Sequence, residues 1–399
     1  MFKKSLVTIA ALGAFAGSAF AGVTLYGTVD GGFQYSNSKL KNHDAKSAFK
    51  LAEGIGSANK FGIKGEEKIS DDLAVGFKLE NGFNLANGAL AGAPKKATDP
   101  TRLFDREAVL YAKTVAGTIA VGREGAISSG LGMFGQFGGK VAAYSNGRGD
   151  VPGLKYVLGS TVNRYDQSLT YESPKFAGVK VLAQFANKGS QAGHGYFDSK
   201  ENDLFYAVGA SFENEQFYGT ALVDVLDKHD KSQKDGVKVS LGGNVKFDGF
   251  QVFAAGQYFK ELPLNVDSLY MSTTAATFDA AKPEALKYTL PTYKGFGLMA
   301  GVAVPVATGS LKGTLGYMNA KAVTPLTVKY PAPQGAPAVS SHADFKLNRF
   351  VVGAVYDYPL SKSTFIYSGV GATFEKYKNV DEVKNGRSFA ANFGLTHNF

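Results

Sequence analysis

The chain ends on the stretch RSFAANFGLTHNF, residues 387–399. If this stretch is a strand, one face is apolar and largely aromatic, and it carries Phe389, Ala391, Phe393, Leu395, His397 and Phe399. The other face is polar and carries Ser388, Asn392, Thr396 and Asn398. A terminal aromatic residue adds little to a soluble core because chain ends usually fray. In a transmembrane β-barrel, by contrast, a terminal aromatic residue completes the girdle of aromatic side chains at the membrane interface. This stretch therefore favours a barrel.

The same alternation recurs along the whole chain. In 72–80, for example, Val75, Phe77 and Leu79 alternate with small or charged residues. A period of two places successive side chains on opposite faces of a sheet, so each run predicts a strand. Sixteen such runs begin near Val23, Ala58, Asp72, Leu103, Ala116, Arg164, Ala177, Asp203, Glu215, Asp235, Gly249, Lys287, Gly309, Phe345, Ser363 and Arg387. A stretch with some helical character covers 279–286.

The connections between these runs alternate between short and long. The long connections are 36–57, 85–102, 188–202, 228–234, 262–286, 320–344 and 378–386. Short turns at one end and long loops at the other are typical of outer-membrane barrels. A soluble β-sandwich also alternates, but it uses shorter strands and buries its apolar face. In lipid the sheet must close, because an open edge leaves backbone groups unpaired. The sequence therefore predicts an all-β fold, a 16-stranded antiparallel transmembrane β-barrel.

Composition excludes several other classes of protein. The chain has 399 residues, with 49 Gly, no Cys and no Trp. Without Cys there is no disulfide framework and no thiolate metal site. A mean hydropathy of −0.09 is too polar for a bundle of membrane helices. A hydrophobic content of 44% is too high for a disordered chain.

The first 21 residues have the features of a secretory signal peptide. Lys3 and Lys4 form a positive start, 6–15 is apolar, and Ala19 and Ala21 supply the small residues that precede a cleavage site. We expect cleavage after Ala21, which leaves 22–399 as the barrel domain. Removing the two lysines lowers the formal net charge from +9 to +7.

Seven stretches resemble the trimeric general diffusion porins of Gram-negative bacteria, in particular the beta-proteobacterial and neisserial branch. They are VTLYGT (23–28), KFGIKGEE (60–67), LENGF (79–83), LFDR (103–106), GTIAVGR (117–123), YPLSK (358–362) and the final Phe399. Residues 190–345 match in pattern only. The resemblance implies sixteen strands, a homotrimer, and a third loop folded into the barrel. It also implies a C-terminal signal for the barrel-assembly machinery, at Phe393, Leu395 and Phe399.

The predicted third, constriction loop covers about 125–160, which is too long for an idle connection in a compact fold. Within it, Gln136-Phe137-Gly138-Gly139 resembles the family's constriction motif, but the family commonly has an acidic residue where this chain has Gln136. The candidate residues of this loop are Glu124, Phe134, Gln136, Phe137, Gly138, Gly139, Lys140, Tyr144, Arg148 and Asp150. An ordinary extracellular loop is the alternative.

Basic residues on the barrel wall are the candidates for selectivity, since rings of Lys or Arg favour anions. Lys60, Arg106 and Arg164 match the family's wall arginines by position, and Arg123 and Lys78 add to the field. Alternation places Arg164 on the face of Ser168, and Arg106 opposite Val109 and Tyr111. The sequence therefore predicts an anion-preferring channel for small hydrophilic solutes and ions. The alternative is that these groups are paired with Glu66, Glu80 or Asp166.

Other functions find little support in the sequence. The five His are scattered without metal-ligand spacing, so no enzyme activity, metal or cofactor is expected. Basic runs are absent, so no nucleic acid is expected. The expected partners are outer-membrane lipid, lipopolysaccharide, the assembly machinery and two further copies of the chain. A solute-selective porin with an aromatic track at Phe134, Phe137 and Tyr144 remains an alternative, as does a plugged adhesive barrel.

Overall fold

The computed structural model describes residues 22–92, 102–160, 164–187, 203–270, 287–289, 291–329, 338–340, 344–380 and 384–399. The predicted signal peptide and the predicted helical stretch at 279–286 lie outside the described residues. In the described part of the chain, no helix has the length and apolarity needed to cross a membrane.

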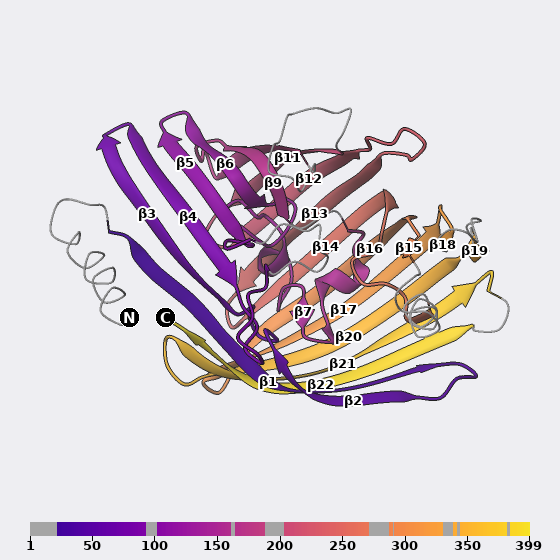
Figure 1. Ribbon diagram of the computed structural model, residues 1–399. Helices are drawn as coiled ribbons and strands as arrows, with labels where there is room; N and C mark the ends of the chain where they lie inside the picture. The colour runs from indigo at the N-terminus through magenta and orange to yellow at the C-terminus, as the bar shows by residue number, and fades with distance from the viewer. Residues whose placement is uncertain are drawn as a thin grey trace, which may run out of the picture.

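One large antiparallel sheet makes up most of the molecule (Figure 1). Its strands are β1 (Thr24–Leu40), β2 (Lys46–Glu53), β3 (Lys60–Ser70), β4 (Leu73–Gly82), β5 (Glu107–Thr114), β6 (Gly117–Gly125), β9 (Arg164–Glu172), β10 (Val179–Asn187), β11 (Leu204–Glu213), β12 (Phe217–Asp227), β13 (Gly236–Phe247), β14 (Phe250–Leu262), β16 (Tyr293–Val306), β17 (Gly309–Ala322), β20 (Lys346–Pro359), β21 (Thr364–Lys378) and β22 (Asn385–Asn398). Shorter elements are β7 (Gly147–Arg148), β8 (Val151–Pro152), β15 (Lys287–Thr289), β18 (Leu326–Lys329), β19 (Ala338–Ser340) and the 3-10 turns η2 (Gly138–Lys140) and η3 (Leu154–Val157).

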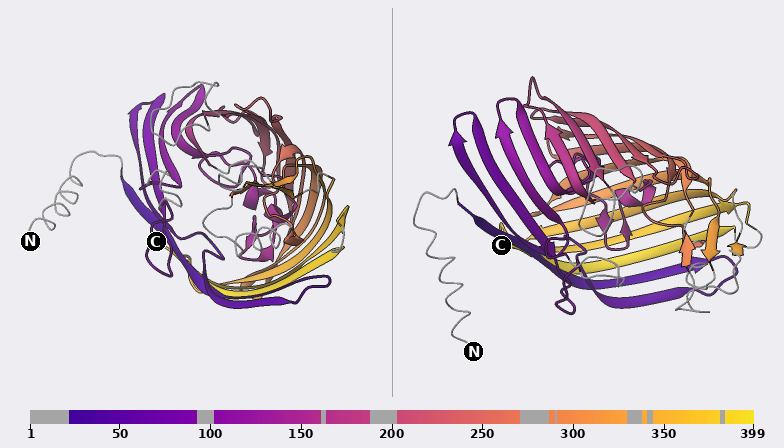
Figure 2. Two further views of the ribbon diagram at one scale, coloured as in Figure 1. Left: turned by 45° about the vertical axis from the view of Figure 1, so that its right-hand side comes forward. Right: turned by 45° about the horizontal axis from the view of Figure 1, so that its top comes forward.

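The sheet closes on itself through β1. This strand pairs with β22 on one side, and on the other side with β3 near its start and β2 near its end. The 17 strands of the sheet therefore fill sixteen positions in a ring (Figure 2). Tight turns join the strands at one end, at 71–72, 115–116, 248–249 and 307–308. The predicted 16-stranded antiparallel barrel is confirmed.

Two strand boundaries differ from the sequence prediction. The predicted loop 36–57 is wrong, because β1 continues to Leu40 and β2 returns along it. Phe33 of β1 stacks on Phe49 of β2 with ring centroids 5.8 Å apart. The run predicted from Lys287 begins later, and the barrel strand β16 starts at Tyr293. Polar residues dominate 36–48, so alternation gave no signal there.

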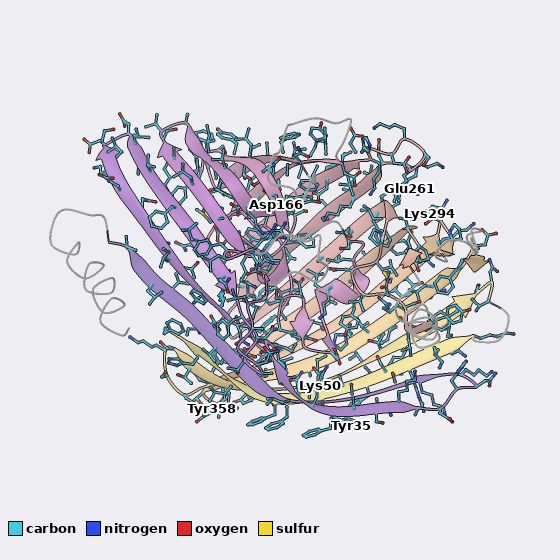
Figure 3. All side chains as sticks on the ribbon, in the orientation of Figure 1. Tyr35, Lys50, Asp166, Glu261, Lys294 and Tyr358 are labelled. Carbon is cyan, nitrogen blue, oxygen red and sulfur yellow. The ribbon has the colours of Figure 1, made fainter. Side chains whose placement is uncertain are left out.

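The distribution of apolar and polar side chains over the two faces of the wall is the reverse of that in a soluble protein. Phe393 of β22 and the following Phe399 are about half exposed, whereas Asn392 and Thr396 of β22 are buried. Tyr35 and Tyr358 likewise project from the outer surface (Figure 3). Apolar side chains outside and polar side chains inside are expected of a barrel that lipid surrounds.

Deleting Phe399 should reduce the amount of folded barrel in the outer membrane. The Gly27 N–H donates to the Phe399 carbonyl at 2.9 Å, and the Phe399 N–H donates to the Gly27 carbonyl at 3.1 Å. The loss of two such bonds lowers the free energy of unfolding by about 2 kcal/mol. Quantification of folded protein in isolated outer membranes checks this, with Phe399→Tyr as the control. Equal amounts for the deletion and the wild type would contradict it.

Candidate functional site

Residues 126–160, here called the constriction segment, leave the wall after β6 and fold inside the barrel (Figure 2). The Ile127 N–H donates to Gln184 of β10 at 3.0 Å. Further along, the Tyr144 hydroxyl donates to the Pro152 carbonyl at 2.6 Å and lies 2.7 Å from the Thr314 hydroxyl of β17. The segment therefore follows the inner face of the wall from β10 onward.

The part of the segment around Arg148 is fixed by a buried charge. Arg148 Nη2 lies 3.0 Å from Asp357 Oδ2 of β20, and Arg148 Nη1 donates to the Gly56 carbonyl. Asn392 of β22 donates to the Arg148 carbonyl at 2.8 Å, and Gln34 of β1 donates to Asp150 at 2.7 Å. The segment thus spans the inner wall from β10 to β1, and Arg148 serves as an anchor rather than as a free charge.

The aromatic residues of the segment pack against the wall. Phe134, Phe137 and Tyr144 are 2–4% exposed. Gln136 is also buried; it receives a hydrogen bond from the Tyr218 hydroxyl at 3.0 Å. These side chains are therefore unavailable to form an aromatic track along the channel. The large apolar side chains of this segment hold the loop to the wall instead of lining the channel. The sequence pattern alone could not distinguish these two roles.

The Gly138-Gly139 pair forms a tight turn beside these aromatic residues. Gly138 has φ +64°, and its Cα packs against Gly130, where a Cβ would lie only 2.7 Å from the Gly130 Cα. Lys140 follows this turn; its ammonium donates to Gln136 Oε1 at 3.2 Å and lies 5.5 Å from the Tyr218 ring centroid. Lys140 therefore places a cation where the segment turns.

A cluster of charges occupies the wall formed by β3, β4 and β5, on the other side of the barrel (Figure 2). Glu80 of β4 is buried at its centre. Arg106 Nε lies 2.6 Å from Glu80, Lys60 3.9 Å and Lys78 4.0 Å. Lys78 also pairs with Glu107 of β5. The structure thus brings together three of the five predicted wall cations and pairs each of them.

A second charge cluster lies at the start of β9, where two arginines share Asp166 (Figure 3). Arg102 Nη2 lies 2.8 Å and Arg123 Nη1 2.5 Å from its carboxylate. Arg123 Nε also donates to the Asp105 carbonyl at 2.6 Å. Sequence reasoning missed Arg102, because it stands at the end of a long loop where no alternation indicates a face.

Arg164 differs from the other cations of the wall. Its Nε is buried and has no hydrogen-bond partner among the residues the structure describes. It lies near enough to Arg106 and Arg123 for their like charges to act on it. Glu107 and Glu80 also act on it, but among the described residues none of the carboxylates lies within ion-pair distance. Its charge therefore adds to the field of the wall.

Alternation gives the wrong face for three neighbours of Arg164 and Arg106, namely Tyr165, Val109 and Tyr111. Gln167 has φ +49°, and the register between β6 and β9 shifts by one residue there. This bulge turns Tyr165 inward, where it stacks on Phe205 with centroids 4.0 Å apart. On β5, Val109 and Tyr111 also turn inward and are buried. Arg106 reaches Glu80 on the inner face from just before the strand.

The constriction segment carries fewer acidic than basic side chains. Residues 126–160 carry Lys140, Arg148 and Lys155 against Asp150, a formal charge of +2. Burial lowers the pKa of Lys140 and of Lys155, and Asp150 partly offsets the effect on Lys155. Glu124 is buried at the base of the segment, and its Oε1 accepts the Met133 N–H at 2.9 Å. Among the described residues, no three His, Cys, Asp or Glu side chains gather as metal ligands.

Replacing Arg148 with Met should loosen the constriction segment and destabilise the barrel. After the change, Asp357 keeps Lys312 at 2.7 Å as its partner. The guanidinium donors to Asp357 and to the Gly56 carbonyl are lost. Breaking a largely buried pair costs about 3 kcal/mol. Because the chain has no Trp, unfolding in urea is followed by far-ultraviolet circular dichroism. Lys175→Met, which breaks an exposed pair with Glu213, is the control; equal losses in both variants would contradict the anchor.

A closed barrel with lipid-facing aromatics and an inward segment defines the chain as a multi-pass β-barrel of the Gram-negative outer membrane. A family model described as Gram-negative porin matches residues 8–379, and the chain belongs to that family. It is 26% identical to an outer membrane porin protein of Bordetella pertussis over 423 residues, and the match covers the whole of both chains. It is 25% identical to the major outer membrane protein P.IB of Neisseria lactamica over 400 residues, again covering both chains fully.

Solved structures share the fold. The anion-selective porin from Comamonas acidovorans superposes with a TM-score of 0.59 at 18% identity, covering 95% of this chain and 99% of that one. OmpF of Salmonella typhi gives a TM-score of 0.52 at 15% identity, with 94% and 97% covered. These structures confirm the fold, and the family model confirms the predicted family.

Proposed function

We propose that this porin forms a water-filled channel for passive diffusion of small hydrophilic solutes and ions, and that it prefers anions. The observation that carries the preference is the charge balance of the constriction. Among the described residues, the wall cluster holds six basic side chains, Lys60, Lys78, Arg102, Arg106, Arg123 and Arg164, against five acidic ones, Glu80, Asp105, Glu107, Glu124 and Asp166. The constriction segment adds a further excess of basic charge.

The distribution of these charges matters as much as their sum. Glu80, Glu107 and Glu124 are each 1–4% exposed, whereas the Lys60, Arg102 and Arg123 side chains retain 21–30% exposure. A mobile ion therefore meets these cations more directly than those three carboxylates, while Asp166, which pairs with both arginines, is 36% exposed. In a low-dielectric barrel wall, such a field concentrates counter-ions, which supports chloride and small organic anions as preferred solutes.

We further propose a homotrimer in the outer membrane, since the family resemblance implies one. The barrel strands from β3 to β11 have only 8–11 residues, whereas β16, β17, β20, β21 and β22 have 14–15. Short strands beside long ones leave one side of the barrel shallow, and a neighbouring copy could cover that side. In this proposal the protein acts as a channel and not as an enzyme.

Channel recordings on detergent-refolded protein test the function. Stepwise conductance in a planar bilayer, together with swelling of liposomes in small sugars, is the expected result. A folded barrel that neither conducts nor permits swelling would favour the plugged, adhesive role and overturn the proposal. Swelling with one solute class alone would instead favour a solute-selective porin.

A further inference from the structure

A second segment enters the barrel besides the constriction segment. Residues 263–270, here called the second inward segment, follow β14 and run beside the end of the constriction segment. The Ser160 N–H donates to the Pro263 carbonyl at 2.7 Å, and the Asn265 N–H donates to the Leu158 carbonyl at 3.0 Å. Gly159 and Leu264 form an isolated antiparallel bridge between them. The two segments are thus joined backbone to backbone.

Arg349 of β20 ties both segments to the wall. Its Nη1 donates to the Tyr156 carbonyl of the constriction segment at 2.9 Å and to the Val266 carbonyl at 2.8 Å. Its Nη2 donates to the Asp267 carbonyl at 2.7 Å. The side chain is 1% exposed. One guanidinium therefore holds three backbone carbonyls from two segments that lie more than 100 residues apart in sequence.

Glu375 of β21 completes this clamp. Its Oε1 accepts Arg349 Nε at 2.7 Å, and its Oε2 accepts the Leu269 N–H at 2.8 Å. Tyr270, at the end of the segment, packs against Phe345 and Tyr377 with ring centroids 5.8 Å and 5.7 Å away. The carboxylate thus fixes the other end of the second inward segment while it neutralises the buried guanidinium.

The wall does not need this pair for its own integrity. Strands β20 and β21 are already joined by a continuous ladder from Lys346 to Pro359. A buried ion pair is costly to desolvate, and it contributes little net stability unless further hydrogen bonds satisfy it. Here the further bonds of the guanidinium go to the inward segments. Glu375 accepts the Leu269 N–H and also the Tyr377 hydroxyl of the wall. The planar five-donor fork of Arg suits several acceptors at once, whereas the single ammonium of Lys cannot serve them together.

We propose that residues 263–270 form a second wall of the constriction and that Arg349 is the positioning residue that sets the aperture. This inference rests on the proposed channel function. A cavity of about 240 Å³ remains between the two segments and strands β1, β21 and β22. Asn37, Asp150, Asp267 and Arg387 line it, so it is polar and carries both signs of charge. Solutes that pass on this side are selected by the position of the second inward segment.

Three variants test the proposal in planar bilayers and in liposome swelling. Arg349→Lys keeps the charge but loses the fork, so single-channel conductance should rise about 1.5-fold and larger sugars should enter, with ion selectivity unchanged. Asn265→Pro removes the donor to Leu158 without touching the wall and should shift both readouts the same way. Arg349→Met with Glu375→Met removes both charges and keeps the test available if the lysine variant does not fold.

Lys175→Arg is the control, because it keeps the charge and lies in the exposed turn between β9 and β10, away from both inward segments. It should leave the conductance and the size limit as in the wild type. Folded Arg349→Lys and Asn265→Pro channels with wild-type conductance and size limit would overturn the inference while the channel function stands. A folded wild type that does not conduct would overturn the proposed function itself.

Discussion

Replacing Lys60, Arg106 and Arg164 together by Gln should abolish the anion preference of the channel. The triple variant leaves Lys78, Arg102 and Arg123 as the cations of the wall cluster, against Glu80, Asp105, Glu107, Glu124 and Asp166. The wall cluster then carries a formal charge of −2, which the +2 of the constriction segment balances. We expect the chloride-to-potassium permeability ratio to fall toward one, because neither basic nor acidic rings then dominate the field, measured as the reversal potential in a KCl gradient.

Single variants separate the contributions within this cluster. Arg164→Gln should give the largest shift of any one change, because Arg164 Nε has no partner among the described residues. Lys175→Gln carries the same charge change to the exposed turn between β9 and β10 and serves as the control. If the triple variant keeps the wild-type reversal potential, the wall cluster does not govern selectivity.

Replacing Gly297 by Ala should displace the constriction segment. A Cβ on Gly297 of β16 would lie 1.7 Å from the Val157 carbonyl oxygen and 2.7 Å from its carbon. These are backbone atoms of η3, which cannot swing aside as a flexible side chain does. Overpacking of this kind costs about 1–3 kcal/mol, so the segment should shift off β16. We expect a higher and noisier open-channel current in single-channel recordings.

Gly313→Ala is the matched control for this change. The nearest atom to a Cβ at Gly313 is 3.9 Å away, so the same methyl group fits without strain. Its current should match the wild type. Quiet, wild-type currents in a folded Gly297→Ala channel would show that the segment does not rest on β16.

Much of the fold could be predicted from the sequence because a membrane wall repeats one rule. Every strand must present apolar side chains to lipid, so regular alternation of apolar and polar residues identifies strands such as β22. The exceptions have local causes. In β2, the outward Phe49 and Leu51 stand among polar neighbours, so the run looked like a loop. In β9, the bulge at Gln167 turns Tyr165 inward, which a count of period two cannot detect.

The site was less predictable, because its contacts depend on closure of the barrel. Lys60, Lys78 and Arg106 could be proposed from their motifs, and Glu80 could be named as a possible partner. That all three share Glu80 emerges only when β3 and β4 are side by side. Arg148 and Asp357 are 209 residues apart, and Arg349 meets Tyr156 across 193. Such pairs leave no spacing signal, so the anchoring of the inward segments required the structure.

The reversal potential of the wild-type channel tests the central claim most directly. Refolded protein in a planar bilayer under a KCl gradient should give stepwise conductance whose current reverses toward the chloride equilibrium potential. That result supports an open channel governed by the excess basic charge of the constriction. A current that reverses toward the potassium equilibrium potential would contradict it, because the buried carboxylates would then dominate the field that ions experience.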